Sequence, residues 1–458
     1  MIPYFPKQIS QRGVLLYLAA VISISLAYHS FAMPFRYLAL GLAFVLGFFL
    51  FVPYISRSLL RRPESKVATV IFFIAVSLRL IWVVISYFYY IKVTGQPFEF
   101  GAADALGYHE EAAWLAECPW RLTWIWFFGE DSNGISDVGY PLYLTLLYKV
   151  FGISVIIPRL IKAFLSAYTC ILIYRLSARS FGEETGRMAG IMCALMPNLI
   201  IYCGYHLKET EMLFLEVAFL ERMDYLLRAR KWNFVNIVVP ILLAGSLFFF
   251  RTVLGAAAVF AFATAVLFSN TPTMKRGWKR AAIIGWGLMV IAVAGGGAAA
   301  TEIESYWEQR DDNQVRKRAQ QTIRGNQWAK YATGTVMAPM ALVLPFSTMV
   351  NVDGQFGQQE KHGGNFIRNF MGFFAILAIY EAIRRKKWRD FALIGALTIS
   401  YLGVVSLSGF SNSERFLLPA LPGLILMWAY GISTLRAKTY CMAEKMGVDL
   451  NKDKNEVK

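Results

Sequence analysis

The feature that most constrains this chain is a series of apolar runs, each 16–26 residues long, separated by short basic clusters. A helix rises about 1.5 Å per residue, so a run of this length crosses the hydrocarbon core of a bilayer, which is about 30 Å thick. Only 17% of the 458 residues are charged, whereas about 25% are charged in a typical soluble domain. The pattern predicts an all-α polytopic membrane protein and excludes a soluble enzyme, a secreted disulfide scaffold and a disordered tail protein.

Basic clusters set the predicted topology, because Lys and Arg are retained on the cytoplasmic side of a membrane. Seven clusters, from Lys7 and Arg12 to the tail that starts at Arg436, are assigned to that side. The apolar runs between them then form about twelve membrane helices (eleven to thirteen), with both termini in the cytoplasm. The predicted spans are 14–29, 36–54, 67–92, 158–177, 188–205, 208–226, 233–250, 253–269, 281–300, 367–384, 391–409 and 416–434.

Three features of the sequence qualify this topology. Residues 140–153 are apolar but short and carry Lys149, so we expect an interfacial or re-entrant helix, with a thirteenth span as the alternative. No small-residue cleavage site follows the first apolar run, which favours a first membrane helix over a signal peptide. The net charge of +16 lies mostly between the apolar runs, so it does not indicate a nucleic-acid partner.

The same pattern divides the chain into five parts. A transmembrane hairpin covers 1–66, and a transmembrane core covers 67–300, with an acidic first outer loop at 93–139. A large outer-face loop at 301–366, C-terminal transmembrane helices at 367–434 and a cytoplasmic polar tail at 435–458 complete the chain. Both outer loops are expected to contain short helices, and connections this long are uncommon unless they are functional or disordered. The second loop could bind an acceptor or serve as a lid.

The first outer loop is the most acidic part of the chain. It holds eight acidic residues and a single basic one, Arg121. From Leu106 onward the sequence predicts a short amphipathic helix, with Tyr108 and Glu111 on one face. Asp104 comes just before this helix, so it is either a helix N-cap or a carboxylate with a function.

Ionisable residues also gather at the outer ends of the predicted spans, where they are costly and by default mark a functional cavity. They are His206, Lys208, Glu209, Glu211, Arg251, Glu414 and Arg415. We expect the Lys208 side chain to extend to the head groups without a function. For Arg251 the two interpretations, extension to the head groups and a functional role, have equal weight. Glu414 and Arg415 could also form a charge pair that closes a short loop. Acids facing arginines suit a carboxylate base and a phosphate-bearing leaving group, with Arg415, Arg251 and Arg324 as candidate cations.

Motifs for other chemistries are missing from the sequence. It contains no P-loop, HExxH or dinucleotide fingerprint, so ATP-driven transport and zinc proteolysis lose support. Four scattered histidines are too few for a convincing metal site. A divalent cation, Mg²⁺ or Mn²⁺, could still assist at the acidic first loop.

Five segments in a fixed order carry a family resemblance. They are DALGYHEEAAWLAE, GYPLYLTLLYKVFG, RLIKAFLSAYTCILIYRLSARSFG, GRMAGIMCALMPNLIIYCGYHLKETEMLFL and ERFLLPALP. Together they resemble the GT-C superfamily of polytopic glycosyltransferases, in particular its bacterial protein O-mannosyltransferase-like and aminoarabinose-transferase-like branch. The resemblance covers residues 67–230 and 410–434.

This resemblance implies transfer of a sugar from a polyprenyl phosphate or diphosphate donor to a hydroxyl acceptor. The reaction would occur at the periplasmic face of a bacterial inner membrane. The resemblance implies that Asp104 is the base for the acceptor hydroxyl and that Glu209 or Glu211 is a second acid. It implies a late pair, Glu414 and Arg415, with Arg415 on the phosphate. The substrate-binding residues expected beside them are Tyr108, Glu111, His206, Arg251 and Arg324.

Several alternatives stay open at the level of sequence. The acceptor is a protein Ser or Thr, a lipid or a glycan, and the donor carries one sugar or a whole oligosaccharide, which includes a glycan polymerase. A lipid-linked glycan flippase or transporter would show polar residues through the helix centres and an internal two-fold repeat, and the sequence shows neither. A membrane scaffold without activity would not need an acidic loop facing arginines.

Overall fold

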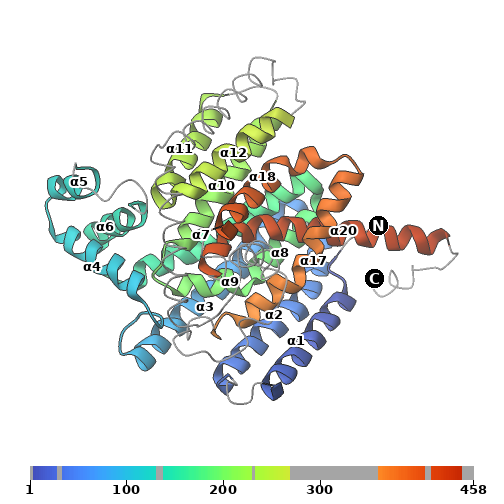
Figure 1. Ribbon diagram of the computed structural model, residues 1–458, viewed down its shortest axis with the longest axis horizontal. Coiled ribbons are helices and arrows are strands. Elements are labelled where there is room, and N and C mark those ends of the chain that lie inside the picture. The colour runs from blue at the N-terminus through green and yellow to red at the C-terminus, as the bar shows by residue number, and fades with distance from the viewer. Residues whose placement is uncertain are drawn as a thin grey trace, which may run out of the picture.

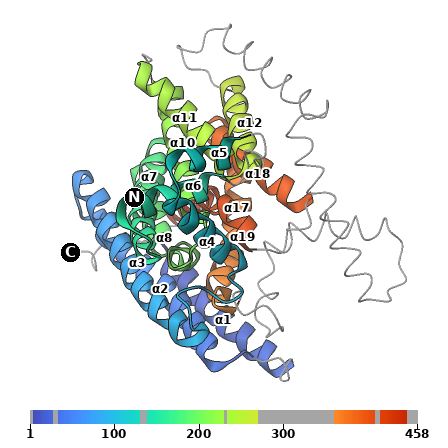
Figure 2. The ribbon, with the colours of Figure 1, turned by 90° about the vertical axis from the view of Figure 1, so that its left-hand side faces the viewer.

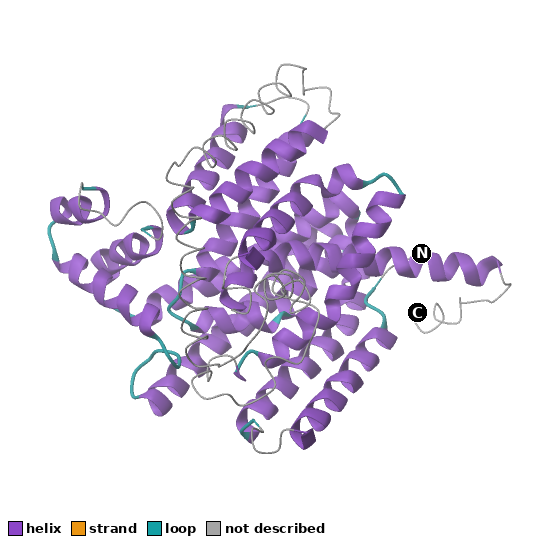
Figure 3. Cartoon of the chain, in the orientation of Figure 1, coloured by secondary structure: helices purple, strands orange, loops and turns teal. Residues whose placement is uncertain are grey.

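The computed structural model describes residues 4–27, 33–129, 138–229, 233–268, 359–407 and 414–445. These residues form helices and connecting loops, with no strand among them, which confirms the predicted all-α class (Figure 1, Figure 3). The described helices up to residue 268 are α1 (Lys7–Ala27), α2 (Phe35–Leu60), α3 (Glu64–Thr94), α4 (Ala103–Glu117), α5 (Trp120–Phe128), α6 (Gly139–Phe151), α7 (Ile156–Phe181), α8 (Glu183–Leu195), α9 (Pro197–Ile201), η2 (Tyr202–Gly204), α10 (Glu209–Arg228), α11 (Phe234–Phe250) and α12 (Thr252–Phe268). Those after it are α17 (His362–Arg384), α18 (Trp388–Leu407), α19 (Glu414–Leu417), η3 (Leu418–Ala420) and α20 (Leu421–Lys445).

Several helices have the length and composition of membrane spans. Six stretches qualify, namely α1, α2, α3, α7, α17 and Glu414–Leu435, and the bent pair Glu183–Leu195 with Pro197–Gly204 makes a seventh. Three shorter apolar helices lie at Phe234–Phe250, Thr252–Phe268 and Asp390–Val405. These helices identify a membrane protein. The count of twelve spans stays a prediction, and the span expected at 281–300 lies outside the described residues.

Helix α7 lies at the centre of the bundle, where it packs against α3, α8 and α10. Helix α17 packs against α20 and α2, and α12 packs against α18. In two views at right angles, α11 and α12 lie at the end of the molecule opposite α1 and α2 (Figure 1, Figure 2). Buried Arg79 of α3 ties the centre together, since it donates to Ser166 Oγ of α7 at 2.7 Å and to the Ala194 carbonyl of α8 at 3.0 Å.

The predicted span at 188–205 is not one continuous helix, because the helix breaks in its middle. Helix α8 ends at Leu195, Pro197 starts α9, and the two parts meet at 52°. Proline lacks the N–H that would continue the helix and disfavours helical backbone at the preceding residue, and Met196 is extended at φ −69° and ψ 115°. After the break, η2 packs against α3, α7 and α10.

Helices α4, α5 and α6 form a group at one side of the bundle (Figure 1). Helix α4 packs against α6. Helix α6 has 13 residues, so it rises only about 20 Å and is shorter than a hydrocarbon core of about 30 Å. Another boundary differs from the prediction, because α20 continues to Lys445 whereas the polar tail was expected to begin at residue 435.

Candidate active site

Arg415 lies between two carboxylates that are distant in sequence. Its Nη1 pairs with Asp104 Oδ2 in α4, and its Nε pairs with Glu209 Oε1 at the start of α10. The Asp104 side chain is 58% exposed, Arg415 is 20% exposed, and Glu209 is 0% exposed. The three residues therefore form a short line of charges that runs from solvent into the protein.

Helix geometry explains how two of these acids are presented. Asp104 and Glu209 both stand in the first turn of their helices, where the helix dipole favours a negative charge. Helix α4 begins at Ala103, with Ala102 as its N-cap and no side-chain cap bond. The N-cap interpretation of Asp104 is therefore wrong, and so is the helix start at Leu106. The Asp104 carboxylate is directed to Arg415.

A second arginine lies on the inner carboxylate. Arg251 follows α11 in extended backbone, and its Nη2 is 3.9 Å from Glu209 Oε1. Its Nη1 donates to the Tyr401 hydroxyl of α18 at 3.0 Å, and its guanidinium stacks 4.5 Å from the Phe416 ring centroid. Arg251 is buried, so snorkelling to the head groups does not describe it. Glu209 is thus enclosed by two guanidinium groups.

Glu414 makes a second charged contact beside Arg415. The side-chain amide of Asn198 donates to Glu414 Oε1, and Lys361 Nζ is 3.6 Å from Glu414 Oε2. Burial alone would lower the pKa of Lys361, but the Tyr202 hydroxyl and the Glu414 carboxylate reverse this and raise the pKa above its ordinary value. Glu414 therefore does not pair with its neighbour Arg415. It anchors the segment that carries Arg415 to α9 and to the residue before α17.

Glu211 belongs to a different buried cluster, although it is only two residues from Glu209. Its Oε2 is 3.7 Å from Lys162 Nζ in α7. Lys162 also donates to the Tyr140 hydroxyl and to the Tyr205 carbonyl, each at 2.9 Å. Of the two acids that the sequence left open, Glu209 is the one at Arg415.

Lys208 is buried at the start of α10. Its Nζ donates to the Phe250 carbonyl at the end of α11 at 3.0 Å, and only 1% of the residue is exposed. The predicted snorkelling of Lys208 to the head groups is therefore wrong. The ammonium instead joins α10 to α11.

Of the remaining predicted binding residues, Tyr108 and Glu111 connect α4 to α6 and α5, and His206 connects α6 to the bundle. The Tyr108 ring packs 5.2 Å from the Tyr140 ring, centroid to centroid. His206 Nε2 is 3.1 Å from the Tyr148 hydroxyl, and Trp126 Nε1 donates to Glu111 Oε1 at 2.8 Å. Burial, reinforced by nearby Lys162 and Arg159, holds the pKa of His206 well below its usual range, so the ring is neutral at physiological pH. Arg324 lies outside the described residues.

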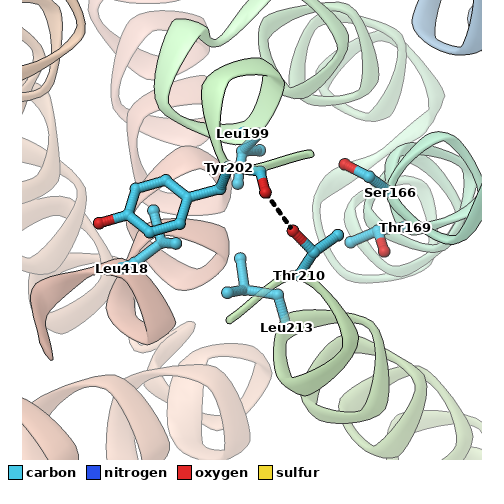
Figure 4. Close-up of a pocket in the computed structure, with 7 residues that line it drawn as sticks. All are labelled: Ser166, Thr169, Leu199, Tyr202, Thr210, Leu213 and Leu418. Atoms are coloured by element: carbon cyan, nitrogen blue, oxygen red, sulfur yellow. Dashed lines mark hydrogen bonds between the residues drawn. The ribbon is translucent and has the colours of Figure 1, made fainter. Parts of the chain in front are cut away.

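Among the described residues, one small cavity lies in the interior next to this site. A cavity of about 10 Å³ lies between α7, α9 and α10, lined by Ser166, Leu199 and Thr210 among others (Figure 4). Its Thr210 hydroxyl donates to the Tyr202 carbonyl at 3.3 Å. A space of this size holds about one water molecule. The exposed side of the charged residues is at Asp104, whose side chain is 58% exposed.

A larger space of about 450 Å³ lies between α12, α17, α18 and α20. Apolar side chains dominate its lining, including Phe260, Phe268, Ile379, Phe391 and Ile399. Ser400 also lines it, and the next residue, Tyr401, is the hydrogen-bond partner of Arg251. Along α18 the lining extends from Phe391 to Ser400, and along α12 it extends from Phe260 to Phe268.

Several residues of this site were not found from the sequence. Lys361 lies in a stretch that reads as a Gly- and Gln-rich loop, and Asn198 and Tyr401 lie within apolar runs. Only Lys361 had a usable signal, a basic residue next to Glu360 immediately before an apolar run. Within the described ranges, no group of three or more His, Cys, Asp or Glu side chains is arranged to hold a metal ion. The divalent cation stays a prediction.

The arrangement offers one exposed carboxylate and two guanidinium groups that meet at a buried carboxylate. A carboxylate accepts a proton from a nucleophile, and arginines bind phosphate oxygens through paired N–H donors. Comparison of the chain with protein-family models, with curated proteins and with solved structures finds no match.

Proposed function

We propose that this protein is an integral-membrane glycosyltransferase. It moves a sugar or oligosaccharide from a polyprenyl phosphate or diphosphate to a hydroxyl acceptor, which is a protein Ser or Thr, a lipid or a glycan. The observation that carries the proposal is the position of Arg415 between exposed Asp104 and buried Glu209. This arrangement combines a proton acceptor with a phosphate-binding cation at one opening, as transfer from a lipid phosphate requires.

The contacts support a simple order of events. The donor phosphate binds Arg415 in place of Asp104, and the Asp104 carboxylate is then available to the acceptor hydroxyl. The acceptor oxygen attacks the anomeric carbon, and the bond from that carbon to the phosphate oxygen breaks. The proton of the hydroxyl passes to Asp104, and the lipid phosphate leaves with the electron pair of the broken bond. Glu209 keeps Arg415 and Arg251 beside the reacting phosphate throughout.

A lipid-linked donor also needs a place for its hydrocarbon chain. The apolar groove between α12 and α18 is lined by Ser400, the residue before Tyr401 in the sequence, and Tyr401 is bonded to Arg251. A phosphate held by Arg251 and Arg415 would direct its prenyl chain along this groove. Because the donor's sugar arrives on a lipid in the bilayer, the proposal needs no nucleotide-binding motif. The expected setting is a bacterial inner membrane, with the opening on the periplasmic side.

The proposal is tested by mass spectrometry of envelope glycoproteins and lipid-linked glycans from a strain that lacks the protein. The strain is complemented with wild type, with Asp104→Asn, or with Glu110→Gln, an exposed acid of the same helix. Wild type and Glu110→Gln should restore the glycan. Asp104→Asn should leave transfer about 10²–10⁴-fold slower, because the base is lost while the shape is kept.

The products then separate the possible acceptors. Loss of protein glycans with accumulation of the complete lipid-linked glycan would identify a transferase that acts on proteins. A glycan shortened by one sugar or one repeat would identify a monosaccharide transferase or a polymerase. A fully active Asp104→Asn protein would remove the assigned base, and unchanged glycans in the deletion strain would remove the proposal itself.

A further inference from the structure

Helix α5 carries an unusual density of exposed aromatic side chains. It has nine residues, WRLTWIWFF. Its exposed apolar side chains are Trp120, Leu122, Trp124, Ile125, Trp126 and Phe128. Trp124 is the most open of them, at 66% exposure. A soluble surface rarely presents so much contiguous apolar area without a partner.

The other side of α5 is fixed to the protein. Thr123 and Phe127 are buried, and the Thr123 hydroxyl donates to the Leu115 carbonyl of α4 at 3.4 Å. The ammonium of Lys149 in α6 lies 4.8 Å from the Trp120 ring centroid and donates to the Ala116 carbonyl at 3.2 Å. The orientation of α5 is thus set by α4 and α6, and its aromatic face is presented outward.

This face is continuous with a surface that has the character of a lipid contact. The Phe128 ring lies 6.3 Å from the ring of Phe249, centroid to centroid, at the end of apolar helix α11. Helix α11 exposes Phe234 and Leu242 along its length, at 80% and 63%. Helix α5 therefore lies at the level where the apolar surface of α11 ends, which is the level expected of a bilayer boundary.

The composition of α5 fits that boundary better than it fits a second protein surface. Tryptophan is enriched where head groups meet acyl chains, because its ring is apolar while its N–H stays hydrated. Arg121 is the basic residue of α5, is exposed, and suits the phosphate groups of phospholipids.

We propose that α5 is an interfacial helix whose aromatic face inserts into the head-group boundary of the bilayer. Helix α5 follows α4 directly, and α4 carries Asp104. Insertion of α5 therefore fixes the C-terminal end of α4 at the membrane surface, while Asp104 lies in the first turn at the opposite end. This inference concerns the membrane contact of α5 and does not depend on the proposed reaction.

The test measures tryptophan fluorescence of the full chain in phosphatidylcholine vesicles. A variant with Trp120→Phe, Trp124→Phe and Trp126→Phe keeps the face apolar, and its difference from wild type isolates the emission of these three residues. The difference emission is recorded with bromine near the head-group end of the acyl chain, with bromine near the terminal methyl, and with iodide in the water. The matched control is Trp428→Phe, which removes a wholly buried tryptophan.

We expect the larger part of the α5 difference emission to be lost with bromine near the head groups, and less with deep bromine or iodide. The Trp428→Phe difference should respond to none of the three quenchers. Quenching of the α5 emission by iodide alone would show that the helix faces water. Stronger quenching by deep bromine would show that the helix is inserted into the hydrocarbon core. Protection from all three quenchers would show that protein covers the face. Each of these three results would overturn the proposal.

Discussion

Arg415 has carboxylate partners of opposite exposure, and this distinguishes it from the other arginines of the site. Glu209 is enclosed and also faces Arg251, whereas Asp104 is open to solvent. The enclosed contact is therefore the one that fixes the position of the guanidinium. The open contact is the one that a phosphate would replace.

Removal of this guanidinium should weaken binding of the lipid phosphate. We expect Arg415→Ala to reduce donor affinity by about 10- to 100-fold, since hydrogen bonds to a charged group contribute about 1.5–3 kcal/mol. The measurement is titration with the polyprenyl phosphate alone in detergent. Arg222→Ala, which removes a half-exposed arginine of α10, should leave the affinity unchanged. Equal affinities for wild type and Arg415→Ala would rule out the phosphate role.

Glu360 gives a prediction about pH. The hydroxyls of Tyr90 and Tyr205 donate to its Oε2 at 2.7 and 3.0 Å. Burial nevertheless raises the pKa of Glu360, which favours its protonated form in the folded protein. Its contribution to stability is therefore complete below the unfolded pKa of about 4.3 and declines as pH rises through the folded pKa.

Replacement of Glu360 by glutamine should remove this pH dependence. A neutral amide carries no buried charge at any pH, so the Tm of Glu360→Gln minus that of wild type should increase from pH 5 toward pH 8. Thermal unfolding in detergent at several pH values measures it. Glu110→Gln, an exposed acid on α4, serves as the control. A difference that is constant or falls with pH would contradict the assigned direction.

At the scale of elements, helix α17 approaches α2 through two glycines. A Cβ added to Gly41 would lie 2.1 Å from the His362 ring, and one added to Gly363 would lie 2.8 Å from the Gly41 carbonyl oxygen. The His362 ring is itself held, because its Nε2 is 2.9 Å from the Tyr17 hydroxyl. This contact sets the start of α17 and therefore the position of Lys361.

Two glycines of the same helix provide a matched pair of substitutions. Gly41→Ala should lower the free energy of unfolding by about 1–3 kcal/mol, because the ring or the whole of α17 must move. At Gly47 a Cβ would meet nothing within 4 Å, so Gly47→Ala should raise stability by about 0.5–1 kcal/mol through helix propensity. Thermal unfolding in detergent compares the two. Equal effects would mean that the α2–α17 approach is not tight.

At the scale of the whole molecule, the charged site and the basic clusters lie at opposite ends of the same helices. Helix α3 starts just after the cluster at Arg61 and Arg62 and ends at Thr94, before the loop that leads to Asp104. Helix α17 starts beside Lys361 and ends in the cluster at Arg384. The positive-inside rule then assigns Asp104 and Arg415 to the outer face.

Labelling in intact cells tests this assignment. Glu110→Cys, beside the site, should react with a membrane-impermeant thiol reagent added outside. Lys387→Cys, in the basic cluster after α17, should react only after lysis. Both positions are exposed, and the parent chain with its own cysteines gives the background. The opposite labelling pattern would invert the topology.

The sequence predicts the helices well because long apolar runs have few alternatives to a buried helix. It also identifies Asp104, Glu209, Arg251 and Arg415 as a set, since ionisable residues at the ends of apolar runs are rare. It does not predict which acid meets which base. Glu209 and Glu211 look equivalent in sequence, and only the packing of α10 against α7 directs Glu211 to Lys162. The helix break at Pro197 could have been predicted from the sequence, because proline interrupts a helix.

The separation of the charged partners along the chain has a consequence for biogenesis. Asp104 and Arg415 are 311 positions apart, and Glu209 and Arg415 are 206 apart. Ribosomes add about 5–20 residues per second, so Arg415 emerges about 10–40 s after Glu209. During that interval the nascent protein can insert its early helices but has no complete site. The proposed activity would therefore begin only when translation has nearly finished, and a chain released before residue 414 would lack Arg415 and remain inert.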